Sequence, residues 1–172
     1  RALHSFPTRR SSDLIFQYSV TTVTAPMGYG KTTAVSAFLK QAENDGVSVR
    51  RQSIYGDSSA SFWKGFCRLF SGTAVYKELV ALPFPTDENS RAFFLELLEQ
   101  AFEKNDRPFC CFIDDLHLLT DPSVFALLFA LGRLALPEFH LILASRNPIF
   151  SPSEKLRLGQ NLLRSEELRA GN

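Results

Sequence analysis

The sequence predicts an α/β fold with three layers, in which a mostly parallel central sheet has helices on both faces. Three observations support this class. Segments with the pattern of buried strands alternate along the chain with segments of helical periodicity. A glycine-containing loop joins the first strand to the first helix. The polar residues capable of chemistry directly follow apolar runs, and ligands of such sheets bind at the carboxyl ends of the strands.

The first half of the chain is predicted to contain two strands and two helices. An apolar strand is expected over 19–24, and a helix over 32–42, where apolar residues recur at the spacing of one helical face. The turn signal ENDG, residues 43–46, separates that helix from a second strand over 47–54. A helix rich in aromatic residues is expected over 59–70.

The second half continues the alternation. After the proline-containing loop LPFPTDENS, apolar periodicity predicts a helix over 91–104. The run PFCCFIDD, residues 108–115, has the pattern of a strand buried on both faces. Asp121 is expected to cap a further helix with Pro122 at its first position. HLILAS, residues 140–145, predicts one more buried strand.

The first fourteen residues stand apart from this pattern. The stretch HSFPTRRSSDL, residues 4–14, resembles a translated sequencing adapter, so residues 1–14 are expected to be a disordered artefact and the domain to occupy residues 15–172. An export signal around Arg9 and Arg10 is the alternative. It is disfavoured because its apolar stretch would overlap the glycine loop.

Composition limits the possible functions. A chain of 172 residues with 45% hydrophobic content is long enough for one domain with a sizeable core. Its net charge is +1, and −1 without residues 1–14, so it lacks the basic character of a direct DNA binder. No apolar run is long enough to span a membrane. Cys67, Cys110 and Cys111 have no metal-ligand spacing and are interpreted as buried thiols, which favours a cytoplasmic location.

The glycine loop predicts a phosphate site. It runs Ala25-Pro-Met-Gly-Tyr-Gly-Lys-Thr, the Walker A spacing with alanine at the leading position. Its glycines let backbone N–H groups surround phosphate oxygens, and the next helix adds its positive end. Lys31 is expected at the β- and γ-phosphates, and the Thr32 hydroxyl at Mg²⁺. The residues predicted to bind the nucleotide are Gly28, Tyr29, Gly30, Lys31, Thr32 and Thr33.

Two acidic residues and one arginine complete the predicted site. Asp114 and Asp115 end an apolar strand in the Walker B arrangement, in which the first carboxylate holds Mg²⁺ and the second orients the attacking water. The alternative is a pair that only closes a strand. Arg146 follows the strand over 140–145 and is expected to contact the γ-phosphate, although strand-end arginines are often merely solvated. His117 is interpreted as structural. Lys31, Asp115 and Arg146 are therefore the predicted catalytic residues.

The order VTAPMGYGKTT, FIDDLHLL and LILASRNP resembles the nucleotide-binding core of STAND-class P-loop NTPases. Within that class it is similar to the large ATP-binding LuxR-type transcriptional regulators, the group that includes the maltose-regulon activator. The resemblance implies ATP and Mg²⁺ as cofactors, with ATP acting as a signal and slow hydrolysis returning the protein to rest. It also implies self-association of the full-length protein and DNA binding only through a C-terminal domain, with residues 15–172 truncated on that side.

Two other function classes stay open at this point. A P-loop enzyme specialised in turnover, such as a motor ATPase or a kinase, would carry the same loop. A scaffold whose loop no longer binds nucleotide is the second alternative, and Mg-ATP would not raise its thermal stability.

Overall fold

The computed structural model describes residues 14–24 and 31–164, and its central element is a five-stranded sheet. Every strand pairs with its neighbours in parallel, in the order β2-β3-β4-β1-β5. The predicted sheet is thus confirmed and is fully parallel. The strands are β1 (Val20–Thr24), β2 (Ser48–Ser53), β3 (Phe109–Asp114), β4 (Phe139–Ser145) and β5 (Leu162–Arg164).

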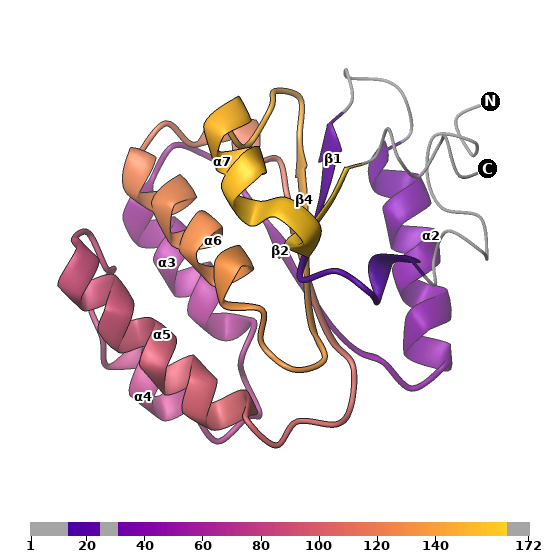
Figure 1. Ribbon diagram of the computed structural model, residues 1–172, viewed down its shortest axis with the longest axis horizontal. Coiled ribbons are helices and arrows are strands. Elements are labelled where there is room, and N and C mark those ends of the chain that lie inside the picture. The colour runs from indigo at the N-terminus through magenta and orange to yellow at the C-terminus, as the bar shows by residue number, and fades with distance from the viewer. Residues whose placement is uncertain (1–13, 25–30, 165–172) are drawn as a thin grey trace.

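The helices cover both faces of the sheet and complete the three predicted layers. Figure 1 shows α2 on one side of the sheet and the other labelled helices on the opposite side. The helices are α2 (Lys31–Asn44), α3 (Ser59–Arg68), α4 (Tyr76–Val80), α5 (Glu88–Phe102), α6 (Pro122–Leu134) and α7 (Pro152–Leu158), with 3₁₀ turns η2 (Leu116–Leu118) and η3 (Gly159–Asn161).

Capping residues decide where several helices begin. The Asp121 side chain accepts a hydrogen bond from the Ser123 N–H, and Pro122 opens α6, as predicted. Helix α5 begins at Glu88, three residues earlier than its apolar periodicity indicates, because Asp87 caps it and Ser90 completes a capping box. The sequence analysis did not predict α4, α7 or β5.

The alternation of side chains along β3 divides the core into two clusters. Cys110 and Phe112 lie in the cluster under α2, whereas Cys111 and Ile113 lie in the larger cluster under the other helices. The three cysteines are free and buried, as predicted. Burial raises the pKa of the Cys110 thiol to about 12 and that of the Cys67 thiol to about 11. These thiols are therefore protonated and unreactive in the folded chain.

Aromatic side chains fill the core at the amino ends of the central strands. Phe109 begins β3 and Phe139 begins β4, and their rings stack with centroids 5.8 Å apart. Phe70 stacks on both rings, and Phe102 meets both edge to face. The opposite ends of the strands carry polar residues. The apolar end of the sheet therefore supports the fold, and the polar end is available for a site.

No helix within the described ranges is long and apolar enough to cross a membrane.

Candidate functional site

The register of the sheet brings the ends of three strands together. Thr24, the last residue of β1, pairs with Ser145, the last residue of β4. On the other side of β4, Ile113 pairs with Leu143, so Asp114 lies level with the residue before Ser145. Strand β4 therefore separates β1 from β3, and their ends are about 10 Å apart, which is two strand spacings.

The predicted phosphate loop begins at this edge. Residues 25–30, including Gly28, Tyr29 and Gly30, lie outside the described residues. Lys31 and Thr32 open α2, but the positions of their side chains also lie outside the described part. Thr33 is exposed in the first turn of α2. Strand β1 ends at the carboxyl edge and helix α2 begins after six intervening residues, which is the order of elements around a phosphate loop.

Asp114 and Asp115 form a short, locally ordered unit at the end of β3. The Asp114 side chain is only 4% exposed, and its Oδ1 accepts a hydrogen bond of 2.8 Å from the Asp115 backbone N–H. Asp115 has φ 63° and ψ 36°, the left-handed region that costs most residues about 1–2 kcal/mol and that aspartate tolerates better than most. This backbone ends the strand immediately after Asp114. A strained non-glycine residue of this kind is common at functional sites.

Arg146 and His117 join the loops that follow β4 and β3. The Arg146 backbone N–H donates to His117 Nδ1 at 3.3 Å. The Arg146 side chain is exposed. The sequence analysis interpreted His117 as structural and did not predict this contact. No local pattern could have revealed it, because the two residues meet only when β3 and β4 pair.

A second connection joins the loop after β2 to the loop after β3. Asp57 accepts hydrogen bonds from the Thr120 N–H at 3.0 Å and the Thr120 hydroxyl at 2.6 Å, and the Ser59 hydroxyl donates to Asp121. Hydrogen bonds from Thr120 hold the pKa of Asp57 below its ordinary value, and a bond from Ser59 does the same for Asp121. The loops after β2, β3 and β4 are thus held together, an arrangement that sequence reasoning missed apart from the Asp121 cap.

The residues at this edge fit Mg²⁺ bound together with a nucleotide. Within residues 14–24 and 31–164 no three acidic, histidine or cysteine side chains are grouped as a protein-only metal cage. Mg²⁺ seldom needs one, since it keeps several waters and binds through one or two carboxylates plus substrate phosphates. Asp114, buried and held at the carboxyl edge, is a carboxylate of the required kind.

Comparison with known proteins identifies the family. The AAA domain family model matches residues 14–147, which is most of the chain. The chain belongs to the AAA domain family. It is an AAA-type P-loop NTPase domain, a class that binds nucleotides, and the parallel sheet with helices on both faces fits that fold. No curated protein matches this sequence.

Solved structures share the AAA fold at low sequence identity. Cdc6p from Pyrobaculum aerophilum has 18% identity and a TM-score of 0.57, with 90% of this chain and 43% of that chain covered. A chain of the Drosophila ORC bound to AT-rich DNA and Cdc6 has 12% identity and a TM-score of 0.61, with 94% and 52% covered. Aeropyrum pernix ORC1 in complex with DNA has 17% identity and a TM-score of 0.53, with 96% and 50% covered. This chain therefore spans about half the length of each of these three solved chains.

Proposed function

We propose that this AAA domain is the ATP-binding switch of a LuxR-type transcriptional regulator, in which bound Mg-ATP sets the state of the protein and hydrolysis is slow. The observation that supports it is the register at the carboxyl edge. Thr24 leads into the phosphate loop, and Asp114 ends the second strand away from it. An Asp114–Asp115 unit about two strand spacings from the end of β1 suits a carboxylate that holds Mg²⁺ beside a bound triphosphate.

Each predicted site residue has a role in this proposal. Lys31 binds the β- and γ-phosphates, with Gly28, Tyr29, Gly30 and Thr33 around them, and Thr32 and Asp114 hold the metal. Bound Mg²⁺ neutralises charge on the phosphate oxygens. Asp115 orients a water toward the γ-phosphate. The Arg146 guanidinium contacts the same phosphate.

The regulatory part of the proposal rests on the resemblance of the ordered motifs to LuxR-type regulators. In that scheme ATP favours self-association of the full-length protein, and a C-terminal domain outside residues 1–172 binds DNA. A cytoplasmic location follows from the same scheme. The test in the full-length protein is whether ATP promotes self-association and whether Lys31→Ala abolishes that effect.

The nucleotide site can be tested directly on this chain. Mg-ATP should raise the thermal stability of the chain, by about 2.7 kcal/mol at a hundredfold excess over Kd. Lys31→Ala should abolish this stabilisation, Asp114→Asn should abolish its dependence on Mg²⁺, and EDTA should reproduce the Asp114→Asn result in the unmodified chain. Lys40→Ala is the matched control, because Lys40 is an exposed lysine further along α2.

Phosphate release measured in the same samples separates the function classes. Release far slower than the typical enzyme turnover of about 10 per second supports a switch. Fast release that depends on Asp115 would instead indicate a turnover enzyme. Equal stability of the chain with and without Mg-ATP would contradict nucleotide binding and favour a scaffold domain.

A further inference from the structure

Strand β2 forms one edge of the sheet, and hydrogen bonds at both of its ends define which way its backbone faces. The Ser48 N–H donates to the Pro108 carbonyl at 3.0 Å, on the β3 side. The Ile54 N–H donates to the Asp114 carbonyl at 3.1 Å, on the same side. The N–H and C=O groups of successive residues point to opposite edges of a strand. Those of Arg50 and Gln52 therefore also point toward β3.

The backbone polar groups of the odd-numbered residues of β2 therefore point away from β3. The N–H and C=O groups of Val49, Arg51 and Ser53 point to the open edge, where the strand order of the described chain ends. The opposite edge strand, β5, is only three residues long. An unpaired row of backbone groups as long as that of β2 is a template for another strand.

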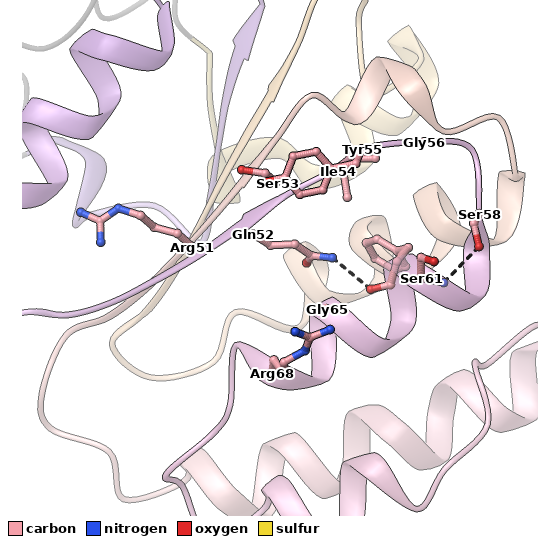
Figure 2. A pocket seen from close by; sticks show the side chains of 11 residues that line it. Arg51, Gln52, Ser53, Ile54, Tyr55, Gly56, Ser58, Ser61, Gly65 and Arg68 are labelled. Atoms are coloured by element: carbon pink, nitrogen blue, oxygen red, sulfur yellow. Dashed lines mark hydrogen bonds between the residues drawn. The ribbon is translucent and has the colours of Figure 1, made fainter.

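A groove lies along this open edge. Its volume is about 550 Å³, and Figure 2 shows β2 on one side of it and α3 on the other. The strand side consists of residues 51–56. The helix side consists of Ser58, Ser61, Phe62, Gly65 and Arg68, whose spacing of three or four residues places them on one face of α3.

Small residues keep the groove open, and a glutamine joins its two walls. Gln52 Nε2 donates to the Phe62 carbonyl at 3.0 Å, which ties the strand to the helix. A Cβ on Gly65 would lie 2.7 Å from Gln52 Nε2, so a side chain at this position would have to displace the Gln52 amide. Gln52 is 8% exposed, and its Oε1 has no hydrogen-bond partner among the described residues. A donor at the floor of the groove would satisfy this oxygen.

The charged residues that line the groove are all basic. Arg51 and Arg68 line it from opposite sides of the strand, and no carboxylate of the described residues does so. Arg51 Nη2 lies 3.6 Å from Glu43 Oε1, but both side chains are more than 40% exposed. Such surface pairs contribute little and exchange readily. The groove is therefore complementary to an acidic occupant.

We propose that the groove between β2 and α3 binds an extended acidic peptide segment of a partner protein, which adds to the sheet as a strand beside β2. Main-chain hydrogen bonds to Arg51 and Ser53 supply affinity in this mode, and side chains supply specificity. Successive side chains of the added strand point to opposite faces, so adjacent acidic residues meet Arg51 on one face and Arg68 on the other. This interaction is separate from nucleotide binding at the phosphate loop.

Amide hydrogen exchange followed by NMR tests the proposal residue by residue. The probe is a blocked heptapeptide of valine and threonine with two adjacent central glutamates. In the free chain the amides of Arg51 and Ser53 should exchange fast, while those of Arg50 and Gln52 should be protected by β3. Saturating peptide should slow exchange at Arg51 and Ser53 by at least about tenfold. A peptide with lysines in place of the glutamates, or with alternate amides N-methylated, should have little effect.

Variants separate strand addition from general charge attraction. Arg68→Glu should weaken peptide binding about three- to tenfold, whereas Arg107→Glu, at an exposed arginine before β3, should leave it unchanged. Ser53→Pro removes an outward N–H that has no partner in the described part of the chain and should weaken binding about tenfold. An unchanged melting temperature of the Ser53→Pro chain shows that it still folds, and Arg68→Glu gives an independent result.

Three outcomes would overturn the proposal. The first is protection of Arg51 and Ser53 in the free chain, which would mean that another segment already covers the edge. The second is no protection at about 1 mM peptide. The third is equal binding of the glutamate and lysine peptides.

Discussion

Replacing Phe94 by alanine should lower the free energy of unfolding by about 3–4 kcal/mol, whereas the same change at Phe93 should lower it by about 1 kcal/mol or less. The two residues are adjacent on α5, but Phe94 is fully buried and Phe93 is 53% exposed. The Phe94 ring meets Trp63 edge to face at 5.5 Å and Phe66 at 6.0 Å. The comparison tests whether α5 packs on α3 as described.

The magnitudes follow from burial and helix propensity. Replacing a buried phenylalanine by alanine costs about 3–5 kcal/mol of stability. The higher helix propensity of alanine offsets about 0.5 kcal/mol of this cost at both positions. About half of the Phe93 side chain is exposed to water in the folded chain. Its replacement by alanine therefore loses only part of the free energy that a fully buried phenylalanine contributes.

Urea unfolding provides the assay. Trp63 is the single tryptophan of the chain, and its fluorescence reports the packing of α3. Circular dichroism is needed as a second probe, because Phe94→Ala also alters the surroundings of Trp63. Equal destabilisation by the two substitutions would refute the packing of α5 described above.

Three further substitutions test other parts of the fold by the same unfolding assay. Burial lowers the pKa of His140 below its ordinary 6.5, so the unfolded chain binds protons more tightly and stability should fall as the pH drops below about 6.5. His140→Asn keeps an N–H donor for the Tyr18 carbonyl and should flatten this pH dependence. Asp121→Ala removes the cap of α6 and should cost about 1 kcal/mol. Gly132→Ala should cost about 1 kcal/mol, because its Cβ would lie 3.2 Å from Val20 Cγ1 in the core and this strain exceeds the gain in helix propensity.

Each of these three predictions can be contradicted by a specific experimental result. An unchanged pH profile in His140→Asn would show that another group controls acid sensitivity. Asp121→Ala should cost more than Asp106→Ala, at an exposed aspartate without such a role, and equal costs would refute the capping argument. A stabilised Gly132→Ala chain would show that the contact between α6 and β1 is looser than described.

Local patterns predicted the long elements well. The apolar run at 108–115 and the Asp121-Pro122 pair gave β3 and the start of α6 within one residue. Helix α4 and strand β5 have five and three residues, too few for periodicity to show. Helix α7 did have a signal, since Ser151 and Glu154 form a capping box around Pro152.

The sequence indicates which polar residues follow the strands, but not how the strand ends are arranged in space. The sequence indicates which residues end strands, because each strand's pattern is local. It does not indicate that β4 lies between β1 and β3, because strand order is set by packing between distant segments. The contact of Arg146 with His117 and the contact of Asp57 with Thr120 depend on that order. The roles of Lys31, Asp115 and Arg146 remain predictions.

The neighbouring thiols of Cys110 and Cys111 can report separately on the helices that cover the two faces of the sheet. Both are protonated and shielded in the folded chain, so an alkylating reagent reaches each one only when its own side of the sheet opens. Modification of Cys110 records departure of α2, whereas modification of Cys111 records opening of the helices on the other face. A single proteolytic peptide analysed by mass spectrometry would therefore show which face of the domain opens first, and whether Mg-ATP closes the side that carries the phosphate loop.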